Sequence, residues 1–241
     1  NAWDPSTGYG KSVLVQYRVA ADPTSLKPVK ELELNCTNVD GGGVHGAVCL
    51  DGHTLYIASI GGYQHYDGTP NDDSMVEAVD LNTMKNRVLV RNSDLYDTNT
   101  RQSAKYPEIS SWTTDFRVLT TTPSGDVYIA SGGWGPNNEY VFKTTLDKLE
   151  KGDLGELVKH FSWSAAFIPF SIGYDVASGL IWTNGAEGDA DYNGSMFSSS
   201  DGGQTWFKHD STVLGGNVAA WNFLYTGEIL SVKSLKLSQS N

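Results

Sequence analysis

The stretch Ser199-Ser200-Asp201-Gly202-Gly203-Gln204-Thr205-Trp206 decides the fold of this chain. It fits the pattern Ser/Thr, any residue, Asp, any residue, Gly, any residue, Thr, Trp/Phe at each constrained position. The carboxylate of Asp201 can accept hydrogen bonds from N–H groups and hydroxyls of its own loop. A glycine takes a backbone conformation that a Cβ would forbid, and Trp206 can pack beneath the turn. The stretch therefore predicts a self-bonded β-hairpin.

This pattern resembles the Asp-box, or BNR repeat, of β-propellers, the architecture of sialidases and many other glycan-active proteins. The resemblance covers eight residues and concerns a structural hairpin, so it implies a fold before it implies an activity. What it implies is a propeller of the sialidase-like superfamily in a secreted or extracellular protein.

Composition favours one turn-rich β domain over residues 1–241. A chain of 241 residues is long enough to bury one sizeable core. Its 26 glycines and 12 tyrosines, with 19% charged residues, are typical of β-structure rather than of a helical bundle or a disordered chain.

The charge and hydropathy patterns exclude two classes of partner. The formal net charge of −11 gives an acidic surface that repels phosphate backbones, so we expect no nucleic-acid partner. The longest uncharged stretch, Phe161–Tyr174, is too short to span a bilayer and contains Pro169, so we expect no membrane insertion.

A repeat of roughly fifty residues runs along the chain, a period typical of propellers. The repeated segments begin at Leu55, Val127 and Leu180, each after a hairpin-type turn: Asp51-Gly52, Ser124-Gly125 and Ser178-Gly179. We expect four strands in each unit. Their ranges are 45–50, 54–59, 75–80 and 87–91, then 116–122, 126–131, 139–144 and 156–161, then 168–174, 180–184, 195–199 and 206–210.

Two more pairs of strands flank these units, at 12–19 and 28–34 and at 218–224 and 228–233. The two pairs could together complete one composite blade. The expected fold is therefore an all-β propeller of four-stranded antiparallel blades. Three alternatives stay open for the ring: four blades, five blades with an extra one around 92–115, and a section of a larger propeller.

The loops on the face opposite the Asp201 hairpin are the expected place of function. In a propeller blade, the loop between the second and third strands opens on the face of the connections between blades. Aromatic rings in these loops can stack on pyranose rings, and acidic groups such as Asp72 and Asp73 can bind hydroxyls. The alternative is that several of the rings pack between blades. The predicted ligand-binding residues are Tyr63, His65, Tyr66, Trp112, Trp134 and Tyr192.

The segment 189–194 resembles the opening of a calcium loop. Asp189, Asp191 and Asn193 place oxygen ligands at alternate positions, and a glycine follows them. Ser200 occupies the place of the distal Glu of an EF-hand. A Ca²⁺ site is one interpretation, and an acidic turn that bonds its own backbone is the other.

Two kinds of catalysis can be considered. The segment 116–119 is similar to the Phe/Tyr-Arg-Ile-Pro segment of sialidases, in which the arginine grips the sialic acid carboxylate; Arg117 is the matching residue. Leu119 replaces the proline, and five scattered arginines do not supply the three that sialidases need, so we do not expect sialidase activity.

A lyase acting on an acidic polysaccharide would need a base, a Tyr or His for the leaving oxygen and a cation. Residues of these types are His45, His65, Tyr63, Tyr66 and Arg117. His45 would begin an inner strand, where a histidine can equally be structural.

Cys36 and Cys49 flank the glycine-rich turn 39–43, which could bring them together. A disulfide between them would fit an extracellular setting, and two buried free thiols are the alternative.

Three functions follow from this reasoning. The first is an extracellular glycan-binding or adhesion module whose partner is a carbohydrate or glycoprotein. The second is an enzyme, a lyase or glycosidase, that cleaves an acidic polysaccharide. The third is a structural module that packs against other subunits of an extracellular assembly.

Overall fold

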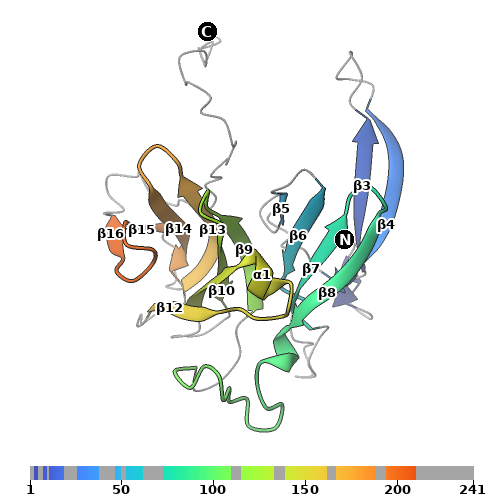
Figure 1. Ribbon diagram of the computed structural model, residues 1–241. Helices are drawn as coiled ribbons and strands as arrows, with labels where there is room; N and C mark the ends of the chain where they lie inside the picture. The colour runs from blue at the N-terminus through green and yellow to red at the C-terminus, as the bar shows by residue number, and fades with distance from the viewer. Residues whose placement is uncertain are drawn as a thin grey trace.

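The computed structural model is built almost entirely of antiparallel β-sheet (Figure 1). It describes residues 3–4, 8–9, 11–18, 26–37, 47–49, 53–61, 73–109, 115–132, 139–161, 167–187 and 194–209.

Three sheets have four strands each, and in each sheet the strands lie side by side in chain order. Each sheet is thus an up-and-down meander of the kind that makes a propeller blade, and the predicted units are confirmed. Blade 1 contains β5 (Ala47–Cys49), β6 (Thr54–Ser59), β7 (Met75–Asp80) and β8 (Lys85–Arg91). Blade 2 contains β9 (Asp115–Thr121), β10 (Asp126–Gly132), β11 (Glu139–Thr145) and β12 (Glu156–Phe161). Blade 3 contains β13 (Phe167–Asp175), β14 (Leu180–Glu187), β15 (Gly194–Ser199) and β16 (Phe207–His209).

The middle blade shows why these sequences form strands buried on both faces. Successive side chains of a strand point to opposite faces. On β10, Val127 and Ile129 pack toward blade 1, whereas Tyr128 and Ala130 pack toward blade 3. The tight turn before this strand depends on Gly125, whose φ of +88° is open to glycine.

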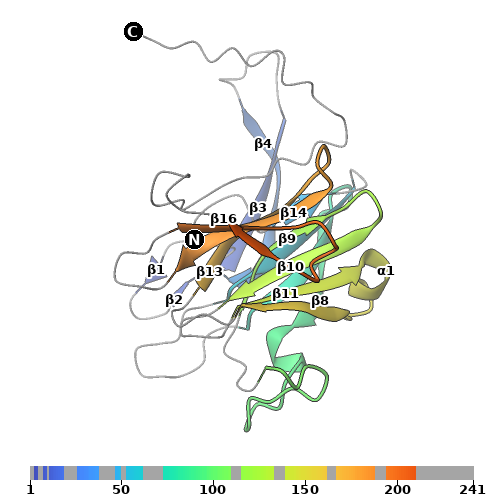
Figure 2. The same ribbon diagram turned by 90° about the vertical axis from the view of Figure 1, so that its left-hand side faces the viewer.

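The blades stack face to face with their first strands close together (Figure 1), and Figure 2 shows blades 2 and 3 from the side. Strand β9 contacts β5 and β6, and β13 makes the same kind of contact with β9 and β10. Because the first strand of each blade packs on the first two strands of the preceding blade, the first strands lie innermost. The described residues therefore form a section of a β-propeller, as the sequence predicts.

A two-stranded ribbon covers the other face of blade 1. It consists of β3 (Lys11–Arg18) and β4 (Lys27–Thr37), and β4 contacts β7 and β8. Leu34 and Cys36 of β4 pack there among buried side chains of blade 1. A further short pair, β1 (Trp3–Asp4) and β2 (Gly8–Tyr9), was not predicted.

Residues 92–109 hold no strand. They begin with the 3-10 helix η1 (Asn92–Asp94) and continue as turns, at one end of the sheets in Figure 1. An extra blade is therefore absent from this described part of the 92–115 segment. The short helix α1 (Leu146–Leu149) precedes β12. Within the described ranges, no helix is long and apolar enough to cross a membrane. The predicted strands at 218–224 and 228–233 lie outside those ranges.

Candidate functional site

The blades have two edges with different character. At one, here called the turn edge, hairpins join β7 to β8, β9 to β10 and β15 to β16. At the other, here called the polar edge, β6, β8 and β10 end and β7, β9 and β11 begin. The turn edge is held together locally, and the polar edge gathers charged side chains from several segments.

The Ser199–Trp206 hairpin at the turn edge is self-bonded, as predicted. The Asp201 carboxylate accepts hydrogen bonds from the Ser199 hydroxyl (2.8 Å) and the Thr205 amide (2.9 Å), and also from the Thr205 hydroxyl. These bonds, those of Thr205 first, lower the pKa of Asp201 to about 2. The Trp206 indole donates to the Gly203 carbonyl at 2.9 Å and packs against the blade 2–blade 3 core. Both oxygens of the Asp201 carboxylate accept hydrogen bonds from residues of the turn, so this hairpin has a structural role.

The polar edge is fixed by hydrogen bonds of Ser74, one of which joins blade 1 to blade 2. The Ser74 hydroxyl donates to the Ser59 carbonyl at 2.7 Å and accepts from the Phe116 amide at 2.8 Å. The Asn92 amide donates to the Ser74 carbonyl at 2.7 Å. These buried contacts hold the start of β9 against the ends of β6 and β8.

Two carboxyl groups lie on this frame. Asp73 accepts hydrogen bonds from the Ser93 amide (3.0 Å) and the Ser93 hydroxyl, and Asp115 accepts from the Asn92 side chain at 3.4 Å. Asp115 is partly exposed, yet burial raises the pKa of its carboxyl to about 7. The charges of Arg117 and Arg101 oppose this shift, and that of Asp73 reinforces it.

Two cations lie near the Asp115 carboxyl. Arg117 is 4% exposed, and its Nε donates to the Gly132 carbonyl at 3.0 Å. Arg101 lies over the Tyr96 ring, with its Cζ 5.1 Å from the ring centroid. The Asp97 carboxylate fixes this loop by accepting from the amides of Asn99 and Thr100, both at 2.9 Å. The polar edge thus offers donors and acceptors in a partly buried setting around an aromatic ring.

Arg117 and Asp73 are the sequence-predicted residues that the structure places at this edge. The other candidates for catalysis and ligand binding lie outside the described residues, as do the three candidate calcium ligands: His45, Tyr63, His65, Tyr66, Trp112, Trp134, Tyr192, Asp189, Asp191 and Asn193. Within the described part of the chain, no group of three acidic, His or Cys side chains is arranged to hold a metal ion.

Asp115, Tyr96 and Arg101 were missed by the sequence reasoning. Asp115 stands two residues before Arg117, but the β9–β10 register shifts at Arg117, and Phe116 and Val118 pack on opposite faces of the blade. Strand alternation alone was therefore not a reliable signal that these two side chains share a face. Tyr96 and Arg101 gave none, since their loop carries no strand pattern.

The proposed disulfide is corrected by the structure. Cys36 is a free thiol, fully buried where β4 crosses blade 1. Burial, followed by the charge of Glu77, raises its pKa to about 12. The Glu77 side chain is also fully buried, and its Oε2 accepts from the Asn35 amide (3.1 Å) and from the side chains of Asn35 (3.0 Å) and Asn86 (3.3 Å). Cys36 belongs to this polar network and is not paired with Cys49.

Comparisons with known proteins give little further information. No protein-family model matches the chain, and no curated protein sequence matches it. Among solved structures, the chain is similar to a GH74 xyloglucanase from Xanthomonas campestris, with a TM-score of 0.38 and 11% sequence identity. The match covers 74% of this chain and 32% of that one, so this chain spans about a third of the xyloglucanase chain. The fold assignment rests on the sheet topology of the chain itself.

Proposed function

We propose that this chain is a carbohydrate-binding propeller module that holds saccharide at the polar edge. The observation that carries the proposal is the convergence of Asp73, Asp115 and Arg117 at the ends of strands from two blades. Saccharide hydroxyls need both donors and acceptors, and loops on a rigid scaffold are the usual place for such groups.

The chemistry of the cluster suits a hydroxyl-rich ligand. With a pKa of about 7, the Asp115 carboxyl can donate or accept a hydrogen bond near neutral pH. The guanidinium groups of Arg101 and Arg117 favour a ligand that also carries carboxylate groups. The expected partner is therefore an acidic carbohydrate or a glycoprotein. By this proposal, the Ser199–Trp206 hairpin is an Asp-box, and the protein works outside the cell.

A second function is favoured by one specific observation. Asp73 lies close enough to Asp115 to help raise its pKa. Enzymes that cleave glycosidic bonds by hydrolysis use one carboxyl group with a raised pKa as the acid beside a second carboxylate. Cleavage of an acidic polysaccharide is accordingly the second candidate, with Asp115 as the acid.

A glycan array of the full chain tests both candidates, with and without calcium. If the chain binds saccharide, the wild type should be retained on specific glycans of the array, and the Asp115→Asn variant should not be retained. The matched control is Asp147→Asn, an exposed acid on α1. Release of shortened or unsaturated products would select the enzymatic function instead. A blank array for the folded wild-type chain would refute both and leave the role as a structural module of an assembly.

A further inference from the structure

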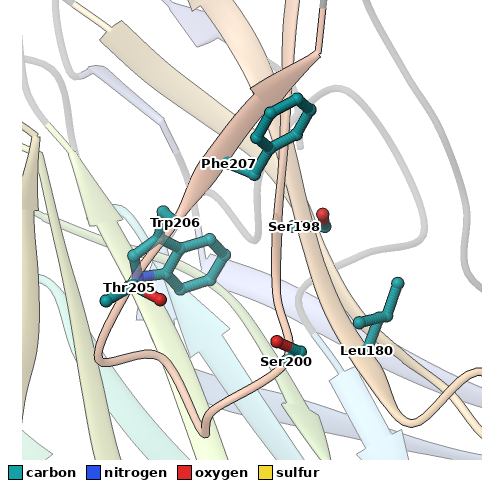
Figure 3. A pocket seen from close by; sticks show the side chains of 6 residues that line it. All are labelled: Leu180, Ser198, Ser200, Thr205, Trp206 and Phe207. Atoms are coloured by element: carbon teal, nitrogen blue, oxygen red, sulfur yellow. The ribbon is translucent and has the colours of Figure 1, made fainter.

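Blade 3 carries a depression near its turn edge, on the face turned away from blade 2 (Figure 3). Strand register pairs Trp182 with Ser198 and Ser198 with Phe207, so these three side chains share that face of the sheet. Ile181 and Phe197 point the other way, into the core between blades 2 and 3. The depression has a volume of about 280 Å³ and is lined by Leu180, Ser198, Ser200, Thr205, Trp206 and Phe207.

The lining combines an exposed aromatic ring with hydroxyl groups at two depths. Phe207 is 66% exposed, which is high for a large apolar residue in a strand. The Ser198 side chain is buried, whereas Ser200 and Thr205 are exposed. A small ligand can therefore enter from solvent, lay an apolar face on the Phe207 ring and reach hydroxyl groups beside it.

Two of these hydroxyl groups are positioned by neighbouring side chains. The Thr205 hydroxyl donates its proton to Asp201, so its oxygen can serve a ligand as an acceptor. The Ser198 hydroxyl lies 2.9 Å from His209 Nε2, and in either tautomer of that ring the Ser198 oxygen keeps a lone pair for a second hydrogen bond. The depression thus favours ligands that donate hydrogen bonds, as sugar hydroxyls do.

The walls of the depression are fixed and uncharged. The His209 ring stacks on Trp182, with centroids 4.8 Å apart, and meets Phe207 edge-on at 4.9 Å. A wall that is already in place spares a ligand the cost of ordering it. None of the six lining side chains carries a charge, so the depression suits a neutral ligand, in contrast to the polar edge with its two arginines.

We propose that this depression is a second saccharide site, separate from the polar edge, which takes one neutral pyranose ring. The C–H face of the sugar lies on Phe207, and sugar hydroxyls donate to Ser198 and Thr205. The volume lies just below the range of about 300–1,000 Å³ that is typical of drug-sized ligand sites, so one ring fits rather than a chain. For so small a ligand, the expected Kd is on the order of 1 mM, too weak for retention on a glycan array.

Saturation-transfer NMR of the full chain with the methyl glycosides of glucose, galactose and mannose tests the proposal. At least one glycoside should receive saturation at its ring hydrogens, and methyl glucuronide should bind no more tightly than methyl glucoside. Phe207→Ala should weaken binding about tenfold, because it removes the main apolar contact. Phe207→Leu, which keeps an apolar side chain without a ring face, should also weaken it. The matched control is Val176→Ala, at an exposed apolar residue of the same blade outside the lining, which should leave the affinity within about twofold.

Several results would overturn this assignment. They are the absence of transfer to all three glycosides, equal affinity of the wild type and the Phe207 variants, and tighter binding of the glucuronide. Sedimentation tests another occupant: a dimer that Phe207→Ala abolishes would assign the depression to a second copy of the chain. Because none of these variants changes the polar edge, failure here leaves the proposed function standing, and the two proposals can fail separately.

Discussion

Replacing Glu77 by Ala should strongly destabilise the protein, since this carboxyl ties β4 to blade 1. Its Oε2 accepts three hydrogen bonds, two from Asn35 and one from Asn86. Orphaning a buried donor costs about 1–3 kcal/mol. Both asparagines are partly exposed, so the low end applies to each donor. The cavity left at a fully buried position adds to this cost, and removal of Glu77 Oε1, which is buried without a hydrogen-bond partner, offsets part of it, so the expected loss is about 3–5 kcal/mol.

Thermal and denaturant unfolding measure this loss. For a chain of this size, the expected drop in Tm is roughly 6–20 °C. The matched control is Glu31→Ala, an exposed acid on β4, which should cost less than about 0.5 kcal/mol. Hydrogen exchange should show that the loss is greatest in β3 and β4. If Glu77→Ala unfolds within about 0.5 kcal/mol of the wild type, the network does not hold the ribbon in place.

Three further predictions concern titrating groups. Asp201→Ala should lower Tm; because the folded pKa is depressed to about 2, the wild-type advantage is present above pH 3.8 and is lost as pH falls toward 2. The contribution of Asp115 to stability depends on pH in the opposite direction. Because its folded pKa is raised to about 7, this contribution to stability is full below pH 3.8 and is lost as pH rises toward 7. Urea unfolding of Asp115→Asn against the wild type should show this slope, and parallel pH profiles would contradict it. In a Cys49→Ser background, the Cys36 thiol should react with a thiol reagent at pH 8 on unfolding alone; rapid reaction of the native protein would refute its burial.

The strands could be predicted because their signals are local. Turn glycines such as Gly125 and Gly179 mark where hairpins reverse, and runs such as 126–132 read as strands buried on both faces. The Asp201 hairpin is equally local, since its donors lie within a few residues.

The candidate site could be predicted only in part. Asp73 and Asp115 are far apart in the sequence, and they approach each other because blade stacking brings the end of one sheet to the start of the next. Glu77 stands in the middle of β7, where a charged residue suggests a solvated face. Its burial depends on the ribbon that crosses it, which no local pattern reveals.

The most direct test of the account is a comparison of two aspartate variants. It uses isothermal titration of the glycan retained by the wild-type chain into folded Asp115→Asn and Asp201→Ala. With the ligand at the polar edge and the hairpin in a structural role, Asp115→Asn should lower the affinity about tenfold or more, or by about 1.4 kcal/mol. Asp201→Ala should bind like the wild type despite its lower Tm. Unchanged affinity in Asp115→Asn, with loss in Asp201→Ala, would contradict the account and move the binding site to the turn edge.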